Sequence, residues 1–141
     1  MKNHKVATLI LSLAGLTGLA NAQSGSIIAE VPFNYIVSGK AMPAGECRVR
    51  VEGDGMSYLW LTAENRSAFA MPIQNDSSQP AEASSLVFHK YGDRYFLAGV
   101  KREGQTRGYE LPAGSLEKEL RASNAEEKDV TLVASLKMFR K

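Results

Sequence analysis

The sequence predicts a mainly β protein of about seven short, largely antiparallel strands, folded as a sandwich or small barrel, with one short helix (about 115–123) before the last strand. Two observations support this class. Short segments of alternating apolar and polar residues recur along the chain, and turn-forming residues separate them about every 8–12 residues. The chain also lacks an extended helical period or a repeat of solenoid length.

Residues 1–22 have the three-part order of a secretory signal peptide: a charged start, an apolar run from Val6 to about Leu19, and Ala20-Asn21-Ala22 as the cleavage motif. The apolar run is shorter than the ~20 residues that a membrane span requires. We therefore expect cleavage after Ala22, an exported protein that is periplasmic or extracellular, and a single β-rich domain at 23–141. An uncleaved N-terminal anchor is the alternative.

Cleavage would remove Lys2 and Lys5, so the 17 Lys and Arg residues would fall to 15, equal to the 15 Asp and Glu residues. A neutral domain exerts no broad attraction on nucleic acid, and we expect no nucleic-acid partner and no transmembrane segment after cleavage. Cys47 is the only cysteine, so no internal disulfide can form. We expect Cys47 to be a small buried side chain, with pairing between chains as the alternative.

The first expected strand, 29–37, has apolar residues at every second position from Val31 to Val37. Met42-Pro43-Ala44-Gly45 then fits a type I turn. The next two strands, 46–52 and 57–62, form a hairpin through Gly53-Asp54-Gly55. We prefer a three-residue loop with Gly55 left-handed, because one face then collects the aliphatic residues and Cys47. The other face collects Arg48, Arg50, Tyr58 and Trp60.

A fourth strand is expected at 67–73, with Phe69, Met71 and Ile73 in phase. It should lie at a sheet edge, because Pro72 cannot donate a backbone hydrogen bond. The polar run 74–84 is expected to be a mobile loop.

The strongest local pattern is 85–100, where Gly92-Asp93 suits a type II′ hairpin turn. This register pairs His89 with Phe96 and Phe88 with Leu97. A polar connection at 101–108 follows, and Ser115 is expected to cap the helix, which would plug one end of a barrel or cover an open face. The last strand is expected at 130–136.

The chain resembles a group of small, signal-bearing exported bacterial proteins of unknown function. The residues that carry this resemblance are Val31-Pro32-Phe33, Pro43-Ala44-Gly45, the Phe88 to Phe96 hairpin and Glu110-Leu111-Pro112. The resemblance implies export and the extent of the domain, and it assigns no catalytic or ligand residue.

The sequence contains no Gly-rich phosphate loop, metal-type His pair or nucleophile elbow. We therefore name no catalytic residue and expect no metal and no cofactor. The secondary candidate site is His89 with Tyr91 and Arg94, where His89 would act as a general base. We prefer the interpretation that His89 hydrogen-bonds within the sheet, that Asp93 makes the turn and that Arg94 pairs with Tyr91. A solvated helix face accounts for the carboxylates of Glu117, Glu119, Glu126 and Glu127.

The preferred binding site is the face of Arg48, Arg50, Tyr58 and Trp60, because a guanidinium over an aromatic ring is favourable by ~0.5–1 kcal/mol. Such a face suits a glycan, a peptide or an envelope protein; the alternative is a buried face with the Arg stems packed along the rings. These observations favour a non-catalytic binding or envelope-associated module. The alternatives are a calycin-like carrier with an interior lined by Phe33, Phe88 and Phe96, and an enzyme that uses His89.

Overall fold

The computed structural model describes residues 25–53, 57–123 and 126–137. The expected signal peptide at 1–22 and the loop residue Gly55 lie outside these ranges. Within them the backbone forms eleven strands and one helix, α2 (Ser115–Ala122). The strands are β1 (Ser26–Val31), β2 (Tyr35–Val37), β3 (Lys40–Met42), β4 (Gly45–Glu52), β5 (Tyr58–Ala63), β6 (Arg66–Ala70), β7 (Ile73–Asp76), β8 (Ser84–Tyr91), β9 (Arg94–Lys101), β10 (Arg107–Glu110) and β11 (Glu127–Lys137).

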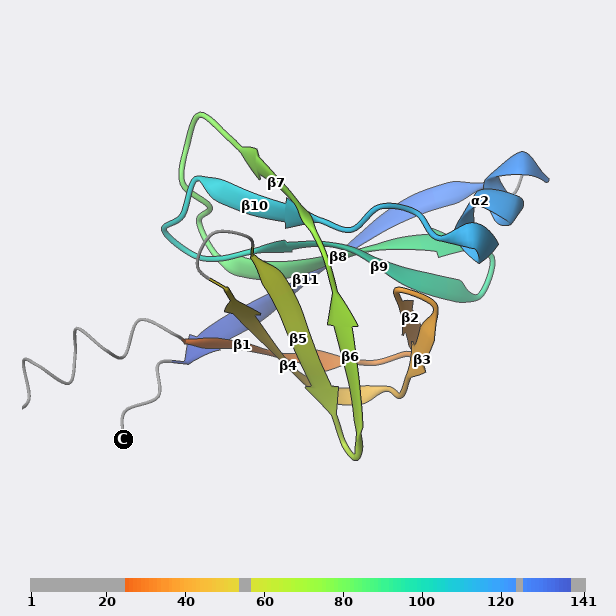
Figure 1. The fold of residues 1–141 in the computed structure, drawn as a ribbon, viewed down its shortest axis with the longest axis horizontal. Helices are drawn as coiled ribbons and strands as arrows, with labels where there is room; N and C mark the ends of the chain where they lie inside the picture. The colour runs from red at the N-terminus through yellow and green to blue at the C-terminus, as the bar shows by residue number, and fades with distance from the viewer. Residues whose placement is uncertain (1–24, 54–56, 124–125, 138–141) are drawn as a thin grey trace, which may run out of the picture.

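The sheet curls into a nearly closed barrel, in which β4, β5 and β6 cross over β8 and β9 (Figure 1). Its strands follow the order β3-β2-β9-β8-β11-β1-β4-β5-β6, while β10 joins β9 to β7. The strand pairs are antiparallel apart from β2 with β9. The two edge strands approach each other where Arg66 Nη1 donates to the Ala41 carbonyl at 3.3 Å. The predicted mainly β class is therefore confirmed, and the barrel is the architecture that forms.

The structure has more strands than the sequence predicted. The expected strand at 29–37 breaks at Pro32, so β1 and β2 pair with different neighbours. The expected loop at 74–84 begins inside β7, and the connection at 101–108 ends inside β10; these two strands pair, with Tyr109 opposite Gln74. Every residue of β7 is exposed, so it lacks the apolar alternation that would have revealed it. The last strand, β11, begins three residues earlier than predicted.

The β4–β5 hairpin has the predicted faces but a longer loop. Val49 pairs with Leu61, and both side chains point inward with at most 1% exposure. Glu52 pairs with Tyr58, which leaves residues 53–57 in the loop rather than three residues. The register is shifted by two residues from the prediction, so Val49 lies opposite Leu61 rather than Leu59, and because side chains alternate with period two, no residue changes face.

The β8–β9 hairpin has the predicted register near its turn: His89 pairs with Phe96, and Phe88 with Leu97. Gly92 has φ 63°, as the first central residue of a type II′ turn requires. A bulge follows, because Val87 pairs with Gly99 and so leaves Ala98 without an opposite residue. The bulge lets Leu97 and Val100, three positions apart, both reach the core.

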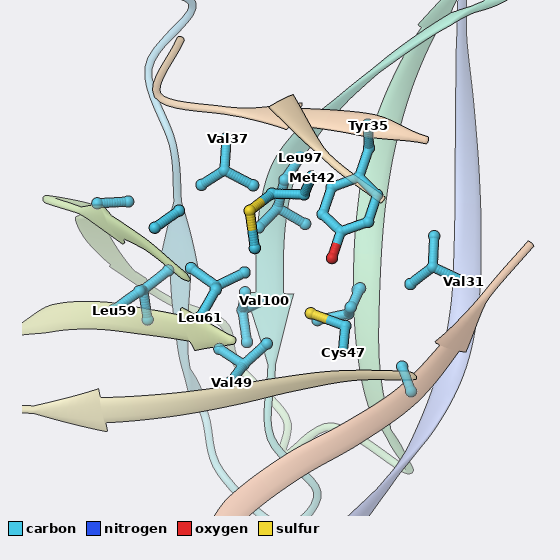
Figure 2. Close-up of a cluster of buried hydrophobic side chains, with 14 of the residues drawn as sticks. Val31, Tyr35, Val37, Met42, Cys47, Val49, Leu59, Leu61, Leu97 and Val100 are labelled. Atoms are coloured by element: carbon cyan, nitrogen blue, oxygen red, sulfur yellow. The ribbon is translucent and has the colours of Figure 1, made fainter. Parts of the chain in front are cut away.

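The core fills the space between the crossing parts of the sheet with side chains from most strands (Figure 2). Cys47 is fully buried there as a free thiol, which confirms the expectation. The hydroxyl of Tyr35 points toward the Cys47 thiol, a weak hydrogen-bonding neighbour, and is buried without a nitrogen or oxygen partner. Burial raises the pKa of both groups, so both stay neutral.

Helix α2 lies at the end of the barrel that carries the β8–β9 turn (Figure 1). Ser115 is its first residue rather than its cap, because Gly114 occupies the N-cap position and no side chain caps the helix. Leu116 is 37% exposed, whereas Glu117 is 4% exposed. The helix therefore meets the sheet through a polar side chain, which an apolar periodicity does not predict. Within the described ranges, no helix is both long and apolar enough to cross a membrane.

Candidate functional site

The predicted binding residues lie together on the outer face of β4 and β5. In the strand pairing Arg50 is opposite Trp60, and Arg48 is opposite Thr62. The Arg50 guanidinium forms an ion pair with Glu52, on the same strand. This carboxylate compensates the charge of Arg50, so the face is less cationic than the sequence suggested.

Strand β6 adds a third ring to this face. Phe69 pairs with Trp60, its ring lies 4.9 Å from the Tyr58 ring and 6.4 Å from the Trp60 ring, and it is 47% exposed. Met71 and Ile73, two and four positions further along the chain, are also exposed apolar side chains, with 47% and 57% exposure. We call these side chains the apolar stripe: Tyr58, Trp60, Phe69, Met71 and Ile73.

The sequence placed Phe69, Met71 and Ile73 on one face but did not show that this face is exposed. The available signal is the residues between them: Ala68 and Ala70 are small, and they are the β6 side chains that enter the core. The larger Leu59 and Leu61 on β5 fill the space that they leave. Inward alanines therefore indicate that the large residues of β6 point outward.

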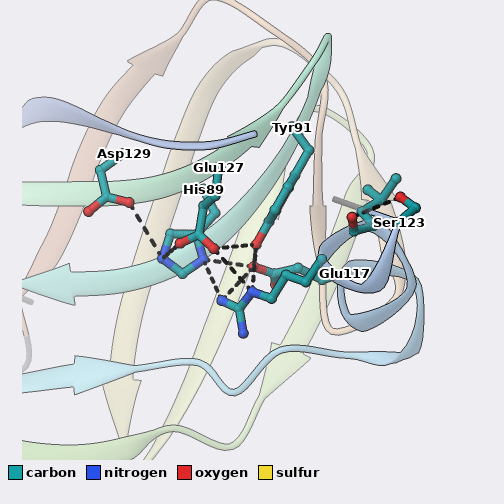
Figure 3. Close-up of polar contacts among 8 residues, drawn as sticks. His89, Tyr91, Glu117, Ser123, Glu127 and Asp129 are labelled. Carbon is teal, nitrogen blue, oxygen red and sulfur yellow. Dashed lines mark hydrogen bonds and ion pairs between the residues drawn. The ribbon is translucent and has the colours of Figure 1, made fainter. Parts of the chain in front are cut away.

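The second candidate site is polar, and it joins α2 to the outer face of β8 and β11 (Figure 3). His89 Nδ1 lies 2.7 Å from Glu117 Oε2. His89 Nε2 lies 3.6 Å from Glu127 Oε2 and 3.7 Å from Asp129 Oδ1. One ligand atom from each of His89, Glu127 and Asp129 lies within 4.8 Å of the others, so the three side chains are close enough to be candidate ligands of one metal ion.

Tyr91 and Arg121 complete the second site. The Tyr91 hydroxyl lies 2.8 Å from Glu117 Oε2 and 3.0 Å from Glu127 Oε1, and Arg121 Nε donates to the Tyr91 oxygen at 2.8 Å. Burial raises the pKa of Tyr91, and its hydrogen bond to Glu117 raises it further. Partial burial alone would raise the pKa of Glu127, but the Tyr91 hydrogen bond and the charges of His89 and Arg121 outweigh it and lower that pKa.

Two sequence interpretations of this region are wrong. Glu117 and Glu127 are not part of one solvated helix face, because Glu117 is buried against the sheet and Glu127 lies in β11. The imidazole of His89 bonds to the helix rather than within the sheet. Arg94 is exposed and opposite Tyr91 in the ladder, yet the guanidinium that reaches the Tyr91 hydroxyl is that of Arg121. These contacts join residues that are 26 to 36 positions apart in the sequence, and no local sequence pattern predicts contacts over such separations.

The aromatic residues considered for a carrier interior do not line one cavity. Phe88 is fully buried in the core, with Phe33 edge-on at 5.1 Å and itself stacked on Tyr95. Phe96 points to the outer face, 5.7 Å from Tyr91. A polar pocket of about 290 Å³ lies at β7, β10 and the connection between β9 and β10, lined by Asp76, Arg102, Gln105, Thr106, Arg107 and Tyr109.

Comparison of the chain with protein-family models, curated proteins and solved structures finds no match. The two sites are therefore interpreted from their own geometry.

Proposed function

We propose that this chain is an exported, non-catalytic binding module that docks an extended segment of a partner protein on the apolar stripe. Export follows from the signal-like order of residues 1–22 and agrees with the resemblance to small exported bacterial proteins. The observation that carries the proposal is the half-exposed row of Phe69, Met71 and Ile73 beside two further rings. Contiguous exposed apolar surface marks sites of interaction.

The composition of the stripe favours a protein partner over a glycan. Aromatic rings alone would suit the faces of sugars, but Met71 and Ile73 offer flexible aliphatic surface that a partner's apolar side chains would bury. The stripe contains no carboxylate, imidazole or thiol, which suits binding rather than chemistry.

The backbone beside the stripe supports an extended partner segment. Strand β7 pairs with β10, so within the described ranges one of its edges has no hydrogen-bonded neighbour, whereas the second edge of β6 faces β3. A strand with one unpaired edge accepts an added strand, whose main chain supplies affinity while its alternate side chains meet the stripe.

Trp60 provides a direct test, because it is the only tryptophan of the chain and lies in the stripe. The processed protein is screened against a displayed library of unstructured peptides and against a glycan array, and binders are titrated while Trp60 fluorescence is recorded. We expect apolar peptides to bind and to shift the emission. The variant Phe69→Ser/Ile73→Ser should lose this binding, whereas Val133→Ser, which removes a 74% exposed side chain on β11, should keep it. Glycan binding without peptide binding, or peptide binding that survives the double substitution, would overturn the proposal.

A further inference from the structure

We propose that His89, Glu127 and Asp129 form a binding site for one divalent transition-metal ion such as Zn²⁺, and that Glu117 orients His89 for it. The ligand atoms would be His89 Nε2, Glu127 Oε2 and Asp129 Oδ1. This proposal does not depend on the apolar stripe, which lies on other strands.

The backbone register brings the three ligands together. Asp129 lies opposite His89 in the β8–β11 pairing, and Glu127 lies opposite Tyr91. Since Glu127 and Asp129 are two positions apart on one strand, both side chains leave the sheet on the face of His89. Paired strands fix these positions more firmly than a loop would.

The distances suit a small ion. Zn²⁺ bonds of 2.0–2.2 Å in a tetrahedral site place ligand atoms about 3.3 Å apart. Nε2 of His89 lies 3.6 Å and 3.7 Å from the two carboxylate oxygens, too far for good hydrogen bonds and a few tenths of an ångström wider than a coordination shell. Tyr91 and Arg121 hold Oε1 of Glu127 and leave its Oε2 toward His89, so a small rotation of the Asp129 carboxylate, whose side chain is 68% exposed, would do most to close the shell.

Glu117 distinguishes this group from a cluster of surface acids. It occupies Nδ1 of His89, which leaves the Nε2 nitrogen facing Glu127 and Asp129. Histidine ligands of metal ions almost always donate the other ring N–H to a carboxylate or carbonyl in this way. The Glu117 side chain is 5% exposed and is held by Tyr91 and Arg121. Its contact with Nδ1 therefore fixes the orientation of the imidazole on the side of the ring opposite the proposed metal ligands.

The charges and the donor atoms select the class of ion. Three carboxylates surround His89, and Arg121 pairs with two of them, Glu117 and Glu127, so its single positive charge offsets one of the three negative charges. A divalent cation would neutralise the remaining two. An imidazole nitrogen with carboxylate oxygens suits zinc and its first-row neighbours, whereas calcium and magnesium sites use oxygen ligands. The exposed side of the site leaves room for water or a partner's group as a further ligand.

The competing explanation is an ion-pair network in which a proton on Nε2, rather than a metal ion, faces the carboxylates. The test uses the processed, untagged chain after treatment with a chelator. Zn²⁺ is titrated by calorimetry, and the ring nitrogens of His89, which is the only histidine outside residues 1–22, are followed by ¹⁵N NMR. We expect one ion per chain and a shift at Nε2 that leaves Nδ1 protonated.

Asp129→Asn, at a largely exposed position, should weaken binding by more than about tenfold without unfolding the protein. Glu119→Gln removes the same charge from an exposed position of α2 and is the matched control, with unchanged affinity expected. Binding of equal strength in Asp129→Asn, an unshifted Nε2 resonance, or no heat with the wild-type chain would each overturn the proposal.

Discussion

His89 Nδ1 lies 2.7 Å from Glu117 Oε2, on the one helical residue in the described part of the chain that is buried. This contact joins helix α2 to strand β8 across 28 positions of sequence. It also gives a buried carboxylate its partners, since Tyr91 and Arg121 reach the same oxygen. The contact therefore both anchors the helix and sets the orientation of the imidazole.

The first prediction concerns this anchor. Glu117→Ala should lower the free energy of unfolding by about 1–3 kcal/mol, because His89 and Tyr91 lose a partner that water replaces only in part. Urea denaturation followed by circular dichroism measures the change. Glu119→Ala, on the exposed side of the same helix, should stay within ~0.5 kcal/mol of the wild type. Equal effects of the two substitutions would contradict the anchoring role.

A milder change separates anchoring from metal orientation. Glu117→Gln keeps an acceptor near His89 Nδ1 but removes the negative charge. If the proposed metal site is correct, Zn²⁺ affinity should fall by about 10–100-fold while the fold remains intact. Calorimetry of the variant beside Glu119→Gln decides this, and an affinity equal to that of the wild type would show that Glu117 has only a structural role.

Two buried tyrosines should respond in opposite ways to loss of the hydroxyl. The Tyr35 hydroxyl has only the weak Cys47 thiol beside it and no nitrogen or oxygen partner, so Tyr35→Phe should leave the free energy of unfolding unchanged or raise it by about 1 kcal/mol. The Tyr91 hydroxyl contacts Glu117, Glu127 and Arg121, so Tyr91→Phe should lower it by about 1–3 kcal/mol. Parallel urea titrations compare them, and a clear loss of stability in Tyr35→Phe would reveal a partner for its hydroxyl.

The accuracy of sequence reasoning here followed the range of the contacts. The pair His89 with Phe96 and the inward face shared by Val49 and Leu61 were predictable, because a turn of known type and a period of two determine a local hairpin. The Glu117–His89 contact could not be predicted from the sequence, since it depends on how the barrel closes and where α2 docks. Strand β7 was missed for a different reason: it is held by backbone pairing and buries no side chain that a sequence pattern could reveal.

The last prediction uses the raised pKa of Cys47, whose thiol burial keeps neutral. In the unfolded chain this thiol ionises near its ordinary pKa of about 8.5, whereas in the folded chain it stays protonated to higher pH. Its contribution to stability is therefore complete below about pH 8.5 and declines as the pH rises through that value toward the folded pKa. Urea denaturation at pH 7 and pH 10 is carried out in the Tyr35→Phe background, because Cys47 also raises the pKa of Tyr35, and should show a larger loss for the protein with Cys47 than for its Cys47→Ala counterpart. An equal loss in both proteins would mean that Cys47 ionises as readily in the folded barrel as in the unfolded chain.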